Sequence, residues 1–138
     1  MRTKIQNKTA SAEIESLGAQ LMSLKNAEGT EYLWQGDPAF WSSRAPVLFP
    51  TVGNVRGGTT IINGKPYALK RHGFARNLEH SVLDSGANFI TYSLKDSEET
   101  RKLYPFVFEL RVTYRLIENG LTTEFAVFNR GDEELPFG

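Results

Sequence analysis

The chain has 138 residues, about the length of one ordinary domain, and 40% of them are apolar, which is enough for a packed core. Sixteen basic residues balance sixteen acidic ones, so the basic excess typical of nucleic-acid binders is missing, and no cysteine is present for a disulfide or a thiolate metal site. No stretch approaches the roughly 20 apolar residues of a membrane span, and the polar N-terminus lacks a signal sequence, so we expect a cytoplasmic protein without nucleic-acid or membrane partners.

Short extended segments separated by turns dominate the first part of the chain. Residues 3–6 and 12–15 are predicted strands, and residues 20–25 partly alternate apolar and polar side chains, with the period of a half-buried strand. A turn at 26–29 followed by residues 31–34 predicts that this strand continues as a hairpin with a glycine-containing loop.

Residues 35–54 differ from the segments around them. Pro38, Pro46 and Pro50 interrupt this stretch, and the residue before a proline is disfavoured in a helix. Large apolar side chains are frequent in it. We therefore predict an ordered, partly buried loop, and loops of this length are often functional.

Three β-hairpins are predicted in the rest of the chain. The clearest joins residues 59–62 to residues 65–69 through Asn63-Gly64, a pair that adopts a type I′ turn at little steric cost. The strand pairs of the other two are residues 80–83 with 89–94 and residues 106–117 with 121–129. We expect the last pair to carry much of the core, because apolar residues alternate in both strands, namely Phe108, Leu110, Val112, Tyr114 and Leu116 in one and Leu121, Phe125 and Val127, with Thr123, in the other.

These elements predict an all-β fold of roughly ten short strands, an antiparallel β-sandwich in which residues 1–138 form one domain. The only helix predicted is Ser97–Leu103, with Ser97 as its N-cap. The apolar end at residues 135–138 leads us to expect that the natural protein continues. If it does not, exposed sheet edges favour pairing with a second copy as a homo-oligomer.

His72 is the first candidate for chemistry. It follows a predicted strand and precedes Gly73, which permits a tight turn and a close backbone approach. Its imidazole suits proton transfer or a hydrogen bond to a sugar oxygen, and the alternative is a structural loop histidine. The second histidine, His80, is expected to be an ordinary strand residue.

Arg44 is the second candidate, because a guanidinium among so many apolar residues needs partners for its donors. Those partners are either protein carboxylates and carbonyls or the hydroxyl or phosphate groups of a ligand. Trp34, Trp41, Tyr67 and Phe74 could stack on a sugar, although aromatic residues at this density are more often part of a core.

Three ordered segments resemble the aldose 1-epimerase (galactose mutarotase-like) family, in particular its bacterial branch. Residues 44–54 carry an R-x-P-x-L-F-P-x-x-G pattern, residues 63–67 read Asn-Gly-Lys-Pro-Tyr, and residues 72–76 read His-Gly-Phe-Ala-Arg. The resemblance implies the N-terminal half of a galactose mutarotase-like supersandwich, truncated here. It also implies a small-molecule sugar as substrate, no cofactor and no metal.

In the family that the chain resembles, an acid and a base open the sugar ring so that α and β anomers interconvert. Two histidines and a glutamate carry the reaction, and His72 matches the first histidine, which assists near the ring oxygen. Arg44 matches a sugar-binding arginine, and Asn54 and Arg76 match positions that face the same cleft. The second histidine and the glutamate would follow Gly138, so we expect the 138-residue chain alone to be inactive.

Two other hypotheses remain open at this point. The chain could be a non-catalytic carbohydrate-binding or regulatory β-sandwich domain that keeps Arg44 and His72. It could also be a structural domain that pairs its open sheet edge with another copy.

Overall fold

The computed structural model describes residues 1–138 as nine strands in three antiparallel sheets, with one short helix. The first sheet has the order β1-β2-β3, the second pairs β4 with β5, and the third has the order β6-β7-β8-β9. The elements are β1 (Arg2–Gln6), β2 (Ala10–Glu15), β3 (Gln20–Asn26), β4 (Thr59–Ile62), β5 (Lys65–Ala68), β6 (Ser81–Ser85), β7 (Phe89–Lys95), α1 (Glu98–Leu103), β8 (Phe108–Ile117) and β9 (Gly120–Asn129). The all-β antiparallel expectation is therefore confirmed, and no helix is long and apolar enough to cross a membrane.

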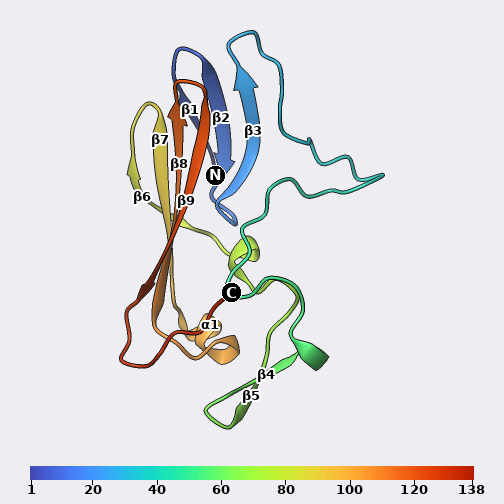
Figure 1. The fold of residues 1–138 in the computed structure, drawn as a ribbon, viewed down its shortest axis with the longest axis vertical. Coiled ribbons are helices and arrows are strands. Elements are labelled where there is room, and N and C mark those ends of the chain that lie inside the picture. The colour runs from blue at the N-terminus through green and yellow to red at the C-terminus, as the bar shows by residue number, and fades with distance from the viewer.

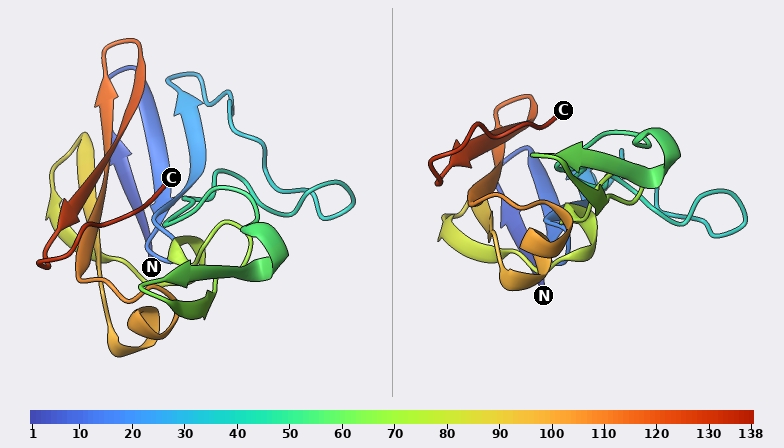
Figure 2. Two further views of the ribbon diagram at one scale, coloured as in Figure 1. Left: turned by 60° about the horizontal axis from the view of Figure 1, so that its bottom comes forward. Right: turned by 90° about the horizontal axis from the view of Figure 1, so that it is seen from below.

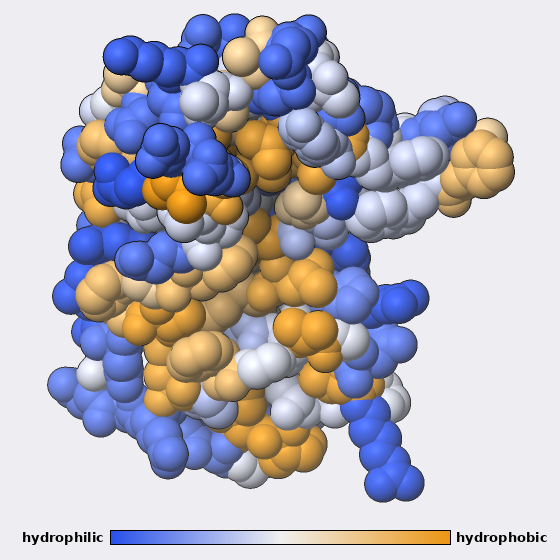
Figure 3. Space-filling view, turned by 45° about the horizontal axis from the view of Figure 1, so that its top comes forward, coloured by the Kyte–Doolittle hydropathy of each residue, from blue (hydrophilic) through white to orange (hydrophobic).

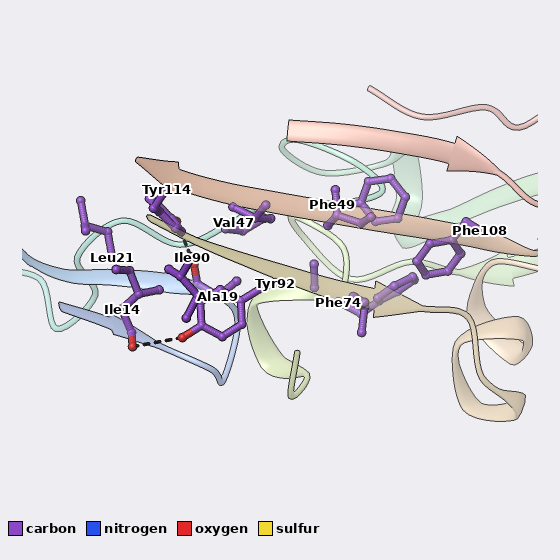
Figure 4. Close-up of a cluster of buried hydrophobic side chains, with 14 of the residues drawn as sticks. Ile14, Ala19, Leu21, Val47, Phe49, Phe74, Ile90, Tyr92, Phe108 and Tyr114 are labelled. Carbon is purple, nitrogen blue, oxygen red and sulfur yellow. Dashed lines mark hydrogen bonds between the residues drawn. The ribbon is translucent and has the colours of Figure 1, made fainter. Parts of the chain in front are cut away.

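The first and third sheets face each other and enclose the core (Figures 1 and 2). The predicted alternation in β8 is confirmed, because every second residue from Phe108 to Leu116 is buried. Two tyrosines tie the layers together: the Tyr114 hydroxyl donates to the Ala19 carbonyl at 2.7 Å, and the Tyr92 hydroxyl lies 3.5 Å from the Ile14 carbonyl (Figure 4). Each hydroxyl reaches a backbone carbonyl of the facing layer, in β2 for Tyr92 and in the turn before β3 for Tyr114, so the polar ends of these large core residues are satisfied.

Strand β9 shares the core less than predicted. It pairs with β8 along its whole length, yet Thr123 and Phe125 are exposed, Phe125 by 57%, and Leu121 and Val127 are only partly buried. Strands β1 and β2 pack against β7 and β8, whereas β9 contributes only the partly buried Leu121 and Val127 to the core. Alternation correctly indicated a strand with one apolar face, but it carries no information about what covers that face.

The hairpin predicted between residues 20–25 and 31–34 is confirmed only next to its turn. A single bridge joins Lys25 to Glu31, and the chain then leaves the sheet. The Glu31 carboxylate accepts from the backbone amides of Leu24 at 2.8 Å and Leu33 at 2.9 Å. A side chain thus takes backbone donors that a longer strand pairing would have used.

The long loop predicted at 35–54 divides into two parts. Its first part projects from the body as an arm (Figure 1), and Figure 3 shows apolar surface at the tip of that arm. Phe40, in this first part, is 82% exposed. Local bonds hold the arm, including one from the Trp34 indole to the Trp41 carbonyl at 2.8 Å. In the second part Val47 and Phe49 are buried, so the expectation of a partly buried loop is correct only there.

Turn and cap predictions agree well with the structure. Asn63 and Gly64 both have positive φ between β4 and β5, as a type I′ turn requires. Ser97 caps α1, and its hydroxyl accepts from the Thr100 amide while the Thr100 hydroxyl accepts from the Ser97 amide. Both predictions rest on residues that are neighbours in the chain.

Candidate functional site

The candidate site is built where residues 49–54 run beside residues 70–76. The Phe49 carbonyl accepts from the amides of Phe74 at 2.9 Å and Ala75 at 3.2 Å. The rings of Phe49 and Phe74 meet edge to face, with centroids 6.2 Å apart, and both contact Tyr104 and Phe108 in the core (Figure 4 shows three of the four rings). An aromatic cluster therefore anchors both segments from below.

Gly73 allows this close approach, as the sequence predicted. A Cβ at this position would lie 2.2 Å from the Phe49 carbonyl oxygen, and the residue has φ of +67°. No other residue type satisfies both conditions without displacement of the backbone.

His72 lies directly before this glycine and is itself in the left-handed region, with φ of +67°. Such a backbone conformation is unfavourable for a residue with a Cβ, and it persists only where the surroundings hold it. Here the His72 amide donates to the Gly53 carbonyl at 2.8 Å, and the Gly53 amide donates to His72 Nδ1 at 2.8 Å. The two bonds orient the half-buried imidazole.

The bond from Gly53 also determines where the imidazole carries its proton. A neutral imidazole has one acceptor nitrogen and one N–H, and Nδ1 is the acceptor here. The proton therefore lies on Nε2, on the other side of the ring. Arg71 Nε is 3.1 Å from that nitrogen.

The surroundings of His72 favour the neutral ring. Desolvation is the main cause that lowers the pKa of His72, and the positive charges of Arg71 and Arg76 lower it further. No carboxylate forms an ion pair with His72. The arrangement thus presents a neutral hydrogen-bond donor.

Arg76 and Asn54 lie close to His72 in different ways. The Arg76 guanidinium donates to the Arg71 carbonyl at 3.0 Å, so it supports the backbone next to His72. Asn54 is exposed and follows Gly53, and its side chain lines an open cavity of about 470 Å³ together with Arg71. The structure brings these residues to one region of the surface.

Arg44 lies at the other end of its segment, and no hydrogen bond or ion pair joins its side chain to His72. Its amide donates to the Gln20 side chain at 3.2 Å, and its guanidinium packs near Gly36. Its Nε is buried without a partner, and no carboxylate neutralises it. The protein partners that would make Arg44 purely structural are therefore missing.

The other residues singled out by the sequence have varied surroundings. Phe74 is core and Tyr67 is half-buried, but Trp34 and Trp41 are exposed on or beside the arm, so the more frequent alternative, a place in the core, does not apply to these two. His80 precedes β6 instead of lying within a strand, and it is buried with Nε2 unpartnered. No three His, Asp or Glu side chains are arranged as metal ligands.

Two features of the site were missed by the sequence reasoning. Arg71 is not among the predicted site residues, although its place directly before His72 is a signal that the two side chains could interact. Residues 135–138 are predicted only as an apolar chain end, without a contact to the site. The Gly138 amide donates to the Pro50 carbonyl at 3.0 Å, and the Gly138 carbonyl accepts from Val52 at 2.9 Å, so this segment lies against the loop that holds His72.

Comparison with known proteins gives a consistent family. The family model described as aldose 1-epimerase matches residues 1–138. The protein LacX of Lactococcus lactis is 37% identical over 139 residues, which covers 97% of this chain and 46% of LacX. A relative from Escherichia coli, whose name includes glucose-6-phosphate 1-epimerase, is 32% identical over 126 residues, which covers 85% of this chain and 39% of the relative.

A solved structure gives the same picture in three dimensions. The galactose mutarotase related enzyme from Lactobacillus acidophilus superimposes with a TM-score of 0.97 at 43% sequence identity. The match covers 99% of this chain and 46% of that one. The chain thus spans about half the length of the relatives that it matches.

Proposed function

The chain belongs to the aldose 1-epimerase family, and on that premise we propose that residues 1–138 are the N-terminal portion of an enzyme that interconverts the α and β anomers of a hexose or hexose phosphate. The family acts on sugars, and the observation that carries the proposal is the held orientation of His72. Its Nδ1 is occupied by the Gly53 amide, so its Nε2–H is the group available to a ligand oxygen.

Anomer exchange needs two proton transfers. A base removes the proton of the anomeric hydroxyl, the bond from C1 to the ring oxygen breaks, and an acid protonates that oxygen. A neutral His72 that gave up its remaining proton would become an imidazolate anion, so we assign it a hydrogen bond to the ring oxygen instead of the acid role. The acid and the base would come from a part of the enzyme corresponding to the remaining length of the relatives.

Sugar hydroxyls would be held by Arg44, Asn54 and Arg76. The unpartnered Arg44 Nε supports a polar ligand at that end of the segment. Arg71 and Arg76 place positive charge beside His72, which is compatible with a phosphorylated sugar as well as a neutral one.

Binding and catalysis can be tested separately on the purified chain. We expect NMR titration with D-galactose, D-glucose and glucose 6-phosphate to show saturable shifts at His72, and His72→Ala to weaken them. We expect polarimetry to show no acceleration of mutarotation, because acid and base each contribute about 10²–10⁴-fold. Mutarotation far above the buffer rate would contradict the assignment of acid and base to residues outside 1–138, and absence of any binding would contradict the site.

A non-catalytic carbohydrate-binding role is the second candidate, and the exposed aromatic residues of the arm favour it. Trp34 and Trp41 present apolar surface on which a sugar could stack. Sugar-dependent changes in tryptophan fluorescence without mutarotation by the full-length gene product would support this role. Mutarotation by that product would exclude it.

A further inference from the structure

Arg71 and His72 place two nitrogen donors against each other. The Arg71 Nε–H points at His72 Nε2 across 3.1 Å and the Gly53 amide points at Nδ1 across 2.8 Å, so an N–H donor faces each nitrogen of the ring, although a neutral imidazole can accept at only one. Because the Gly53 amide already donates to Nδ1, the neutral ring carries its proton on Nε2. Arg71 Nε also carries a proton, so the two groups cannot satisfy each other when the Gly53 bond is intact.

Two N–H groups that meet in this way are both satisfied only when one acceptor lies within hydrogen-bond distance of each. We propose that Arg71 and His72 form a two-donor site that binds one oxygen atom of the sugar, an inference that rests on the proposed function. The Arg71 side chain is exposed, so it can adjust to admit the oxygen, whereas the Gly53 bond keeps the imidazole in place.

The chemistry of the two donors restricts the ligand. A sugar ring oxygen or hydroxyl has two lone pairs and can accept from both groups, whereas an ammonium group or a metal cation would be repelled by the guanidinium. Arg71 and Arg76 are the charged groups that act on His72, and both are cationic. The site is thus complementary to an oxygen that gains negative charge as the adjacent bond breaks.

Arg71 also has a fixed relation to the neighbouring backbone. Its carbonyl accepts from the Arg76 guanidinium at 3.0 Å, which holds the main chain from which its side chain extends. Its side chain lines the open cavity of about 470 Å³ that Asn54 also lines. His72 does not line that cavity, but it is partly exposed and Arg71 is exposed, so solvent reaches both residues.

The first test needs no ligand. Long-range proton–nitrogen NMR distinguishes the two imidazole tautomers, and the chain has only two histidines, so His72→Gln assigns the signals. We expect His72 to carry its proton on Nε2. A proton on Nδ1 would overturn the proposal, because Nε2 would then be an acceptor for Arg71 and no second donor would exist.

The second test adds D-galactose or D-glucose to the 138-residue chain. We expect His72 Nε2 and Arg71 Nε to shift together with one dissociation constant. Arg71→Gln should weaken binding by about tenfold, as for loss of one charge-assisted hydrogen bond, and Arg71→Lys should recover part of it. The matched control Lys70→Gln, which removes a neighbouring exposed charge, should leave binding unchanged.

The outcomes separate this inference from the proposed function. If the sugar shifts His72 but not Arg71, or if Arg71→Gln binds like wild type, the two-donor site is wrong and the proposed function stands. If the sugar shifts neither residue, both are wrong for this chain.

Discussion

Gly53 and His72 are joined by two hydrogen bonds of 2.8 Å that run in opposite directions, one between backbone groups and one from the Gly53 amide to the imidazole. The pair links two segments that are far apart in the sequence. It also holds a non-glycine residue at positive φ. Backbone and side chain of His72 thus contribute together to one local structure.

Removal of the imidazole should expose the Gly53 amide to exchange. We expect His72→Ala to accelerate hydrogen exchange of that amide by about tenfold, because its acceptor is lost while the strained φ is kept. Arg71→Ala is the matched control, since it leaves the Gly53 bond intact. Unchanged exchange at Gly53 in His72→Ala would show that the bond does not form in solution.

Gly73 should tolerate no side chain. We expect Gly73→Ala to lower the free energy of unfolding by about 3 kcal/mol or more, because a left-handed backbone and a clash with the Phe49 carbonyl add together. Gly64→Ala is the control: φ there is +75° and nothing lies within 4 Å of its Cβ, so about 1–2 kcal/mol is expected. Urea denaturation measures both, and equal losses would contradict the role of the clash.

Local sequence patterns predicted much of the fold. Alternation in β8, the Asn63-Gly64 turn and the Ser97 cap depend on neighbours in the chain, and all three are correct. The apolar pattern of β9 failed as a predictor of burial because burial of Phe125 depends on a layer that residues 1–138 do not supply. The Glu31 carboxylate, which takes backbone donors, left no trace in hydrophobic periodicity.

Local sequence patterns also predicted only the local part of the candidate site. Gly73 signalled a close approach, and the approach to Phe49 was found. The bond from Gly53 that sets the tautomer of His72 joins residues 19 positions apart, so no local pattern could show it. The roles of Arg44, Asn54 and Arg76 stay predictions, as do the absence of a cofactor and the cytoplasmic location.

His80 should make the protein sensitive to mild acid. Burial lowers its pKa from the ordinary value of 6.5, the ring is 2% exposed, and Nε2 has no partner. The unfolded chain therefore binds a proton below about pH 6.5 that the folded chain does not, and stability falls as pH drops below that value.

Urea denaturation at pH 7.5 and 5.5 tests this expectation. We expect His80→Gln to lose less stability between the two pH values than wild type does. His72→Gln is the comparison, because the pKa of His72 is also lowered although His72 is more exposed than His80. If His80→Gln keeps the whole pH dependence, then another group causes it.

Glu109 should stabilise the outer face of the third sheet. Its carboxylate, 2% exposed, accepts from Arg111 at 2.8 Å, from Arg130 at 2.6 Å and from Ser93 at 3.0 Å. These bonds, that from Arg111 first, lower the pKa of Glu109 from 4.5 to about 2. We expect Glu109→Gln to lower the free energy of unfolding by about 2 kcal/mol at neutral pH. The loss is smaller than for a fully buried ion pair, because both arginines are partly exposed.

The pH dependence of that loss has a definite sign. Because the pKa of Glu109 is lower in the folded state, its carboxylate stabilises the fold fully above about pH 4.5. This stabilisation is lost as pH falls towards 2. The difference between wild type and Glu109→Gln should therefore shrink over that range. Glu99→Gln, at a pair in which Glu99 is 79% exposed, should change stability little at any pH. A constant difference down to pH 2 would contradict the ion-pair explanation.

Strand β9 should mediate self-association of the 138-residue chain. It is the last strand of its sheet, ten residues long, with an unpaired edge and Phe125 exposed. A free edge beside apolar surface favours pairing with a second copy, and a lysine there opposes it. We expect sedimentation velocity to show concentration-dependent association that Phe125→Lys abolishes. Ile61→Lys, at a residue 66% exposed on β4, should not affect it, and a strictly monomeric wild-type chain would contradict the prediction.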